Sequence, residues 1–536
     1  MADTTFWKQV FPACHLAMGQ TLWTDAEHRG DHDHLDAFPS TLQQVIQDRD
    51  HLAFLPDLAR LEIAVHRLQD CRAQRGKAGI KVNPCLELLE LEWTNLWTMI
   101  PNRSTHPPLT PEYGSQRILV WQDTSGRVRC RPATEPDLAA LKLVTEGISV
   151  PEAAAQTGYP QSRIWPILHK ALREDILLQG ESLIRRAWSI PAELEKYQAA
   201  QAFTLQWHIT QACDLNCRHC YGREARDPLR LEQAMDVLDD FDHFCRTKNV
   251  HGQVSFTGGN PMLHPQLDTI FEEAVNRGFT VGFLGNPTSR ERLQSLLHKG
   301  PITFYQISLE GLEEHNDYIR GPGHFQRSLQ FLDILRELGI YSMVMLTLTQ
   351  ANTGQVLDLA RELEGRADLF TFNRLSTVGS GAYLTPADRE EFTRLLAAYQ
   401  AQAKEISGMG FKDNLFNVYR SQHDLPLFGG CTGYGCGAAF NFVALLCDGE
   451  VHACRKFPSP LGNIHDHCLE EIYDSELADS YRQGPSECQN CRLRPVCRGC
   501  LAVIHSCGKD VFTARDPYCC SRPDEPNLSV GTERLR

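Results

Sequence analysis

The stretch CDLNCRHCYG, residues 213–222, places Cys213, Cys217 and Cys220 in one short loop, with spacers of three and two residues. A closed tetrahedral metal site needs four ligands, so three thiolates leave one position for something else. Three thiolates can hold three irons of a cubane cluster and leave the fourth iron open to a non-protein ligand. A zinc knot that borrows a fourth ligand, such as His219, is the structural alternative.

The chain contains twenty cysteines. In a reducing cytoplasm such a number indicates metal or redox chemistry rather than a disulfide framework. Twelve cysteines crowd between Cys431 and Cys520. Five cysteines are scattered singly, and we expect each to be a small buried hydrophobe: Cys14, Cys71, Cys85, Cys130 and Cys245.

Length and charge narrow the class of protein. A chain of 536 residues is too long to fold around a single hydrophobic core, so we expect at least three domains. The formal charge of -14, from 67 acidic and 53 basic residues, offers no general footprint for a nucleic acid or an anionic membrane. The amino terminus lacks a secretory h-region, and no apolar run approaches about 18 residues. We therefore expect a cytoplasmic protein with no nucleic-acid or membrane partner.

Strands alternate with amphipathic helical stretches in the middle of the chain, which predicts a parallel sheet. Six strand–helix units suit an α/β fold of the partial (β/α)6, TIM-like barrel type. Chemistry in such folds gathers at the carboxyl ends of the strands, and the cysteine loop follows the first strand. The predicted strands are 203–210, 253–259, 280–286, 304–311, 341–349 and 369–379.

The flanking regions have other patterns. Leu58, Leu61, Val65 and Leu68 recur at the spacing of one helix face, within an expected N-terminal helical domain over 1–100. Two alternating runs around Thr124–Gly126 predict a hairpin, and Ser149 and Pro151 mark the start of a following helix. Together they favour a winged-helix-like module over 112–195. The remaining expected boundaries are a barrel core over 200–385, linking helices over 386–428 and a metal-folded, Cys-rich tail over 429–536, which has little apolar material for a core.

The motif CxxxCxxC followed by Tyr221, placed after the first of six strand–helix units, resembles the radical S-adenosylmethionine (SAM) superfamily. The resemblance implies that the three thiolates hold a [4Fe–4S] cluster whose open iron is chelated by SAM. Reductive cleavage of SAM then yields a 5′-deoxyadenosyl radical, which abstracts a substrate hydrogen. A small electron-transfer protein such as flavodoxin or ferredoxin is the implied electron donor.

The same resemblance implies the residues that contact SAM. SFTGGNPM matches the family's GGEP turn, where Gly258 and Gly259 allow close backbone approach and Asn260 replaces the usual Glu. We expect the Asn260 carbonyl to accept a hydrogen bond from the SAM amine. QISLEG and HNDYIRG resemble the family's SLDG and RG segments, which implies that Ser308 contacts SAM and that Arg320 pairs with its carboxylate. Asn373 and Arg374 are expected to face the site or the adenine.

The tail resembles the SPASM extension of peptide-modifying radical SAM enzymes, which holds two auxiliary [4Fe–4S] clusters. The resemblance implies one cluster on Cys431, Cys436, Cys454 and Cys500. The other would be held by Cys488, Cys491, Cys497 and either Cys519 or Cys520. The family usually has three residues before the fourth cysteine of the CxxC block and this chain has two, Arg498 and Gly499. The division of ligands between the clusters stays open here.

Taken together, the chain resembles maturases of ribosomally made peptides. Its nearest whole-chain resemblance is to selenobiotic-family radical SAM maturases, associated with thio(seleno)oxazole-type modification of Cys- or selenocysteine-containing precursors. The implied partner is a precursor peptide, which the winged-helix-like module would recognise. A thioether-forming or sulfatase-type maturase is an alternative enzyme. An alternative of another class is a non-catalytic zinc-ribbon adaptor that binds peptides.

Overall fold

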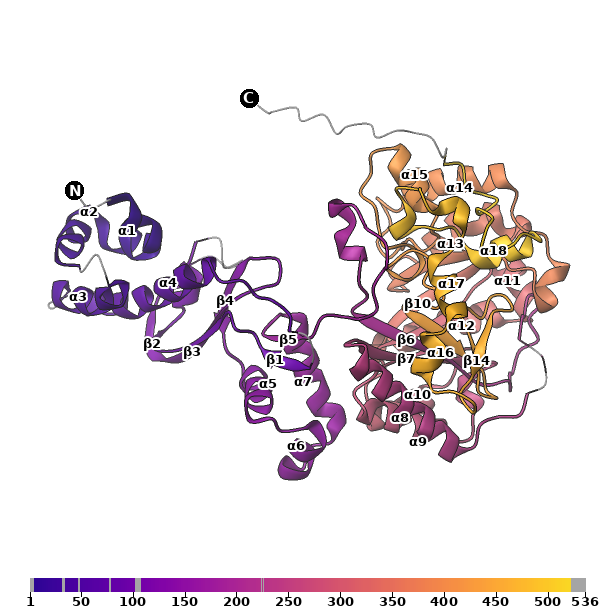
Figure 1. The fold of residues 1–536 in the computed structure, drawn as a ribbon, viewed down its shortest axis with the longest axis horizontal. Helices are drawn as coiled ribbons and strands as arrows, with labels where there is room; N and C mark the ends of the chain where they lie inside the picture. Colours follow the sequence, from indigo (N-terminus) through magenta and orange to yellow (C-terminus); the bar gives the residue numbers. More distant parts are fainter. Residues whose placement is uncertain are drawn as a thin grey trace. The chain divides into compact units, whose positions relative to one another are not determined.

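The computed structural model describes residues 4–30, 34–46, 49–76, 79–101, 108–222, 224 and 226–521. The chain divides into two compact units, Met1–Glu181 and Ser182–Arg536. In Figure 1 the sequence runs from indigo at the N-terminus to yellow at the C-terminus. Each unit is described by itself below.

Unit 1 begins with a helical layer whose centre is α4. The predicted apolar face of α4 is confirmed, because Leu58, Leu61, Val65 and Leu68 are all buried. They pack into one apolar cluster with the aromatic side chains of the preceding helices. The helices of this layer are α1 (Thr4–Val10), α2 (Pro12–Arg29), α3 (Phe38–Val45) and α4 (Leu55–Gln69).

The rest of unit 1 combines antiparallel strands with three helices (Figure 1). The predicted hairpin is confirmed as β3 and β4, and Ser149 caps α6 through a capping box with Glu152. The strands are β1 (Ile80–Val82), β2 (Leu86–Thr94), β3 (Glu112–Gln122), β4 (Val128–Pro132) and β5 (Leu177–Gln179). The helices are α5 (Glu135–Glu146), α6 (Val150–Thr157) and α7 (Gln161–Arg173).

Strand pairing crosses the expected boundary between residues 100 and 112. β2, which falls in the expected helical domain, pairs antiparallel with β3 from Leu86 opposite Trp121 to Thr94 opposite Glu112. β1 pairs with β5 at the end of the module. Backbone hydrogen bonds therefore join residues 80–94 to the hairpin and its helices, and α4 contacts both β2 and β3.

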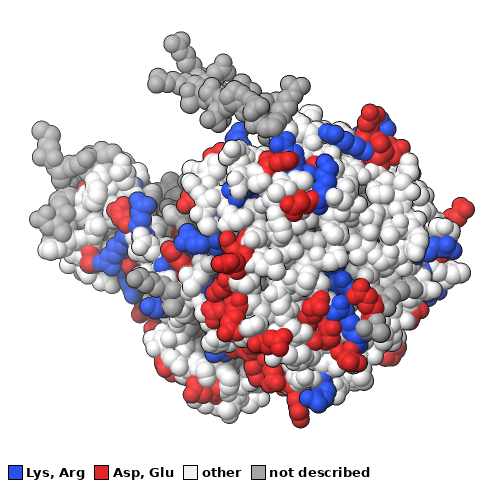
Figure 2. Space-filling model, turned by 45° about the vertical axis from the view of Figure 1, so that its right-hand side comes forward, with Lys and Arg blue, Asp and Glu red and all other residues white. Residues whose placement is uncertain are grey.

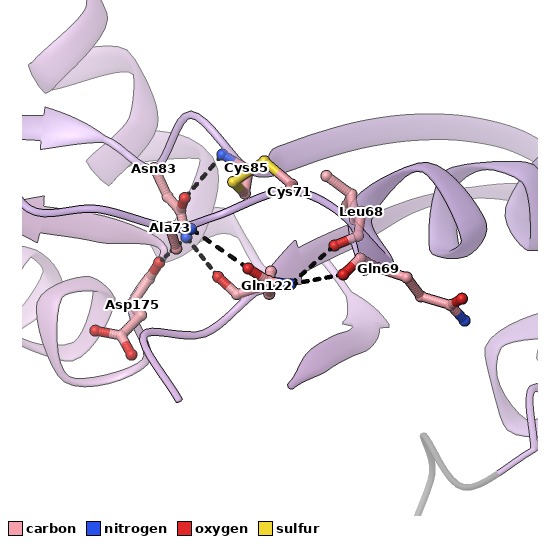
Figure 3. The surroundings of a disulfide bond; sticks show 8 residues. All are labelled: Leu68, Gln69, Cys71, Ala73, Asn83, Cys85, Gln122 and Asp175. Carbon is pink, nitrogen blue, oxygen red and sulfur yellow. Dashed lines mark hydrogen bonds between the residues drawn. A yellow bond between two sulfur atoms is a disulfide. The ribbon is translucent and has the colours of Figure 1, made fainter. Parts of the chain in front are cut away.

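A disulfide corrects the expectation for two of the scattered cysteines. Cys71, just after α4, is bonded to Cys85, just before β2, with a Cα–Cα distance of 5.8 Å. Figure 3 shows Gln122 beside this bond, where its amide nitrogen donates to the Leu68 and Gln69 carbonyl oxygens at 3.1 and 3.2 Å. The other three scattered cysteines are buried as predicted: Cys14, Cys130 and Cys245.

Unit 2 is built on a nine-stranded sheet in the order β11-β10-β9-β8-β7-β6-β12-β13-β14. The six predicted strands are confirmed, and they run parallel as consecutive neighbours, as in a partial barrel. They are β6 (Ala202–Thr210), β7 (His251–Gly258), β8 (Thr280–Leu284), β9 (Phe304–Ser308), β10 (Tyr341–Leu348) and β11 (Leu369–Arg374). The helices between and after them are α8 (Leu231–Thr247), α9 (Leu267–Asn276), α10 (Arg290–Lys299), α11 (Glu313–Arg320), α12 (His324–Glu337), α13 (Val356–Glu362), α14 (Arg389–Gln402) and α15 (Phe416–Gln422).

The strands of the barrel have two unlike faces. On β6, Leu205, Trp207 and Ile209 are buried in the apolar core of unit 2. The alternate positions, such as Gln206 and His208, line a cavity instead. Side chains alternate across a strand, so one face packs on apolar groups while the other supplies polar groups to the inside.

The tail has more ordered structure than expected. β12 (Phe442–Leu445) pairs parallel with β6, so the tail extends the barrel sheet. Its own apolar cluster includes Phe457, Tyr481 and Ile504, which corrects the expectation of a segment with little material for a core. Its other elements are β13 (Glu450–His452), β14 (Pro460–Asn463), α16 (Leu469–Tyr473), α17 (Glu476–Gln483) and α18 (Leu501–Ser506).

A buried ion-pair network also joins the barrel to the tail. Arg374 at the end of β11 donates from Nε to Asp413 Oδ2 at 2.7 Å and from Nη2 to Asp516 Oδ2 at 2.7 Å. All three side chains are buried. Burial lowers the pKa of the Arg374 guanidinium, but the two carboxylates outweigh that effect and raise it well above its ordinary value.

The surface carries mixed charge. On the face shown in Figure 2, blue Lys and Arg side chains are interspersed with red Asp and Glu side chains. Within the described part of the chain, no helix combines the length and apolar character needed to cross a membrane.

The Cys71–Cys85 bond can be tested by counting thiols. Because the other eighteen cysteines carry thiols, alkylation of the unfolded, chelator-treated protein without reductant should modify eighteen cysteines, and alkylation after full reduction should modify twenty. Intact-mass measurement distinguishes the two numbers. Modification of all twenty without reductant would contradict the bond.

The Arg374 network can be tested with Asp516→Asn. Removing one partner leaves a buried guanidinium partly uncompensated, so the free energy of unfolding should fall by about 3–5 kcal/mol. Anaerobic denaturant titration measures the change. The matched control is Asp358→Asn, since Asp358 forms an exposed pair with Arg361, and its effect should stay within about 1 kcal/mol. Equal effects of the two substitutions would show that the network does not stabilise the fold.

Candidate functional site

A cavity of about 640 Å³ lies at the polar face of the barrel strands. The cysteine loop that follows β6 contributes Cys213, Cys217 and Cys220 to its wall. The tail contributes Cys431 and Cys454 to the same cavity. Cysteines more than two hundred residues apart in sequence therefore face one space.

Positions 258 and 259 require glycine, because the backbone there approaches closely the end of the strand that carries the cysteine loop. Gly258 has φ of +123°, and a Cβ there would lie 2.1 Å from the Thr210 carbonyl oxygen. A Cβ at Gly259 would lie 2.2 Å from the Ala212 carbonyl oxygen. Both glycines also line the cavity. The glycines thus set the β7 turn directly against the start of the cysteine loop, a backbone contact that the sequence did not reveal.

Asn260 has partners other than the one expected. Its side-chain oxygen accepts from the Met262 backbone N–H at 3.2 Å, and its Nδ2 donates to Asp214 Oδ1 at 3.0 Å. Asn286 donates to the same Asp214 oxygen at 2.6 Å and approaches the Cys213 sulfur at 3.6 Å. Asn260 is buried and is not among the cavity-lining residues. It holds the cysteine loop in place, and its contact to SAM stays a prediction.

Arg320 lines the cavity but already has a carboxylate partner. Its Nη2 and Nε donate to Glu310 Oε1 at 2.6 and 2.9 Å, and its Nη1 lies 3.9 Å from the Cys217 sulfur. His219 lies 3.5 Å from the same Glu310 oxygen. Burial raises the pKa of Glu310, but His219 and Arg320 outweigh that effect and lower it overall. The expected pairing of Arg320 with the SAM carboxylate would therefore add to an existing ion pair.

Other expected SAM contacts differ in their surroundings. Tyr221 and Ser308 both line the cavity. The Tyr221 ring packs edge-on to His208, with centroids 6.5 Å apart, and burial raises its phenol pKa to about 12. Asn373 lines the cavity as well. Arg374 also reaches the cavity wall, but its guanidinium is bound by the buried carboxylates of Asp413 and Asp516 rather than directed at a ligand.

The tail thiols form two groups. In the first, which we call group A, burial is the main cause that raises the pKa of Cys454 to about 12, and the thiols of Cys436 and Cys500 contribute to the rise. Cys436 and Cys500 act in the same way on Cys431. In the second, group B, burial raises the pKa of Cys497, and three neighbouring thiols add to it. Group A is Cys431, Cys436, Cys454 and Cys500, and group B is Cys488, Cys491, Cys497 and Cys519.

The remaining tail cysteines lie outside both groups. Cys520 is exposed, and its sulfur lies 4.0 Å from the Gln422 amide nitrogen. Cys447 lines the cavity, where burial and Asp448 raise its thiol pKa. Cys468 and Cys507 are exposed.

The donor sets fit iron–sulfur clusters. Four thiolates around a cubane reach four different irons, and a cluster on four thiolates is anionic. Buried cations lie beside the groups: Arg498 donates to the Cys436 carbonyl oxygen and interacts with the thiols of Cys436, Cys497 and Cys488. Arg186 is buried, and its Nε has no hydrogen-bond partner among the described residues. Anionic clusters would offset these charges. No three described His, Cys, Asp or Glu side chains form a site for a single metal ion.

Sequence reasoning missed the roles of several residues in and around the cavity. Glu310 stands in the quoted SLEG segment, where the family has Asp, but its pairing with Arg320 depends on the fold. His208 and Gln206 lie on the predicted strand 203–210, and the period-two alternation around Leu205, Trp207 and Ile209 could have found them. Arg455 carries no such signal, because it lies in a turn after Cys454.

Comparison with known proteins agrees with this geometry. The radical SAM superfamily matches residues 207–363, and an iron–sulfur cluster-binding domain, SPASM, matches residues 436–501. An AdoMet-dependent heme synthase of Methanosarcina barkeri is 26% identical over 345 residues, which cover 60% of this chain and 96% of that protein. Mycofactocin maturase MftC of Mycobacterium ulcerans is 25% identical over 364 residues, covering 64% and 94%.

Among solved structures, Streptococcus suis SuiB bound to precursor peptide SuiA shares the fold, with a TM-score of 0.50 at 18% identity and coverage of 76% of this chain and 97% of that one. The two matched domains bind, respectively, a [4Fe–4S] cluster with SAM and additional iron–sulfur clusters. The chain therefore contains a radical SAM domain and a SPASM iron–sulfur cluster-binding domain.

Proposed function

We propose that this enzyme matures a ribosomally made precursor peptide that contains cysteine or selenocysteine. The observation that carries the proposal is the shared cavity, in which the loop of Cys213, Cys217 and Cys220 faces the group A thiols Cys431 and Cys454. A substrate in this cavity would lie between a site of SAM cleavage and an auxiliary cluster. In that arrangement, the auxiliary cluster would accept the electron that the peptide releases when it is oxidised.

We assign the cluster ligands from the thiol groups. Cys213, Cys217 and Cys220 would hold the cluster that SAM completes, group A one auxiliary cluster and group B the other. Cys519 would be the fourth ligand of group B rather than Cys520, because Cys519 raises the pKa of Cys488 and Cys497 while Cys520 is exposed. Cys500, the fourth cysteine of the CxxC block, would then belong to group A. The other three cysteines of that block would belong to group B.

The protein's own residues would bind and orient SAM. Bound SAM supplies, on reductive cleavage, the carbon radical that abstracts hydrogen. Gly258 and Gly259 would bring the β7 backbone near the methionine end of SAM, and Tyr221 and Ser308 would contact it from the cavity wall. The Glu310–Arg320 pair would fix the loop at Cys217 while leaving guanidinium N–H groups for a carboxylate.

A peptide substrate is supported by the three-stranded sheet of unit 1 and by the relatives. The β2–β3–β4 sheet leaves one edge of β2 and one of β4 unpaired among the described strands, and an extended peptide can add to such an edge. SuiB was solved with a precursor peptide. The structural match to SuiB covers 76% of this chain, which is a larger share than residues 182–536 make up, so the match also includes part of unit 1. A tetrapyrrole is the alternative substrate that the heme synthase relative raises. Flavodoxin or ferredoxin would supply the electron.

The function can be tested with a Cys-rich peptide encoded near this protein's gene. Reduced holoenzyme, SAM and the peptide should give 5′-deoxyadenosine together with a change in peptide mass, because hydrogen abstraction and modification are coupled. Liquid chromatography and mass spectrometry measure both products. Absence of 5′-deoxyadenosine would contradict radical chemistry. Its formation with an unchanged peptide mass, but with turnover of an iron-porphyrin precursor, would replace the peptide by a tetrapyrrole.

The ligand assignment can be tested with the neighbouring pair Cys519→Ser and Cys520→Ser. Cys519→Ser should lower the iron content of anaerobically reconstituted protein by about four irons, the content of one cubane, since group B loses a ligand. Cys520→Ser is the matched control and should keep the wild-type iron content. Loss of iron from Cys520→Ser, with none from Cys519→Ser, would reverse the assignment. A colourless protein that binds zinc in place of iron would support the adaptor instead.

A further inference from the structure

Arg455 is a buried cation on the cavity wall, and no carboxylate among the described residues balances it. Only 7% of the residue is exposed. The other arginines that line the cavity are all paired with carboxylates: Arg226 with Asp448, Arg320 with Glu310, and Arg374 with Asp413 and Asp516. Among the described residues, Arg455 forms no such ion pair. A buried charge without compensation is unfavourable, so this one indicates a missing anion.

The Arg455 side chain lies beside the end of the cysteine loop. Although Arg455 follows Cys454 in sequence, its guanidinium turns toward Tyr221, with Cζ 5.6 Å from the ring centroid. A Cβ at Gly222 would lie 3.5 Å from Arg455 Nη2. Lys412, Lys456 and Arg374 lower the pKa values of group A thiols.

His208 provides a second unsatisfied polar group near Arg455. It lines the cavity from β6 and is 8% exposed, and its buried Nε2 has no hydrogen-bond partner among the described residues. Burial, together with the nearby charges of Arg455 and His452, lowers its pKa to about 3. The ring is therefore neutral at physiological pH and offers one donor and one acceptor nitrogen. Tyr221 packs against both the His208 ring and the Arg455 guanidinium.

The barrel floor beside these residues is polar but uncharged. Gln206, Gln253, Ser255 and Gln306 line it from three strands. Such groups can bind amide groups but cannot balance a cation. A guanidinium presents a planar fork of N–H donors that matches a carboxylate in a bidentate pair. The ligand that complements this part of the cavity is thus polar and carries a carboxylate close to the Tyr221 ring.

We propose that Arg455 and His208 form a substrate subsite that binds a carboxylate of the peptide, with Arg455 as the bidentate partner and His208 as a hydrogen-bonding neighbour. The peptide as carrier of this carboxylate rests on the proposed function. The SAM carboxylate is the other possible source of the same chemistry. The subsite would orient the peptide within the cavity rather than take part in hydrogen abstraction.

The test compares Arg455→Gln, Arg455→Lys and the surface control Arg361→Gln. Peptide binding is measured by fluorescence anisotropy, with the labelled Cys-rich peptide, holoenzyme and SAM but no reductant. SAM binding is measured by equilibrium dialysis without peptide. Arg455→Gln should raise the peptide Kd about ten- to hundredfold, because a charged hydrogen-bonded pair is lost, with the SAM Kd within about twofold of wild type. Arg455→Lys should recover part of the affinity, and Arg361→Gln should match wild type.

A second arm begins with a comparison that uses only the wild-type enzyme, so it does not depend on how well a variant folds. A peptide with each Asp and Glu replaced by its amide and an amidated C-terminus should lose affinity for the wild-type enzyme. It should show no further loss with Arg455→Gln, since the two changes remove one interaction. Additive losses would contradict the pairing.

Three other results have separate meanings. A raised SAM Kd with an unchanged peptide Kd would assign the carboxylate to SAM and overturn the peptide subsite. An unchanged Kd for both ligands would overturn the subsite altogether. Failure of wild-type holoenzyme to bind the peptide would contradict the proposed function, and with it the peptide as source of the carboxylate.

Discussion

The site depends first on the backbone pairing at the two edges of β6. On one side β7 pairs along β6 and ends in Gly258 and Gly259, which lie against Thr210 and Ala212 where a Cβ would clash. On the other side β12 from the tail pairs in parallel over Phe442–Leu445. The cysteine loop starts where β6 ends, so both pairings determine where its thiols lie. A side chain at either glycine would displace the β7 turn, the loop, or both.

Electrostatic balance accounts for much of the remaining arrangement. Thiols that are buried in groups A and B resist ionisation in the absence of iron, and the cations beside them, such as Arg498, are themselves disfavoured by burial. Anionic clusters would relieve both penalties at once, because each charge would then have an opposite charge nearby. Arg374, Arg320 and Arg226 are balanced by carboxylates of the chain itself. Arg455 has no carboxylate partner among the described residues, and we therefore propose a ligand for it.

Sequence patterns predicted the barrel well and the connections poorly. The six parallel strands, the hairpin and the Ser149 cap follow from local periodicity and capping chemistry, and all are present. The pairing of β12 with β6, the pairing of β2 with β3 and the Cys71–Cys85 bond join segments that are distant in sequence or carry no local signal of contact. Likewise, the family resemblance implied SAM contacts for Arg320 and Asn260, but it did not indicate that Glu310 and Asp214 are their partners.

We propose that one cavity brings together SAM cleavage, the substrate and an auxiliary cluster. The central claim is that the chain holds three cubane clusters, of which only the one on the cysteine loop has an open iron. Mössbauer spectroscopy of anaerobically reconstituted protein, with and without SAM, tests this most directly. We expect about twelve irons per chain in [4Fe–4S] form, with SAM changing the signal of one iron site. A content of about four irons, or a spectrum that SAM leaves unchanged, would contradict the account.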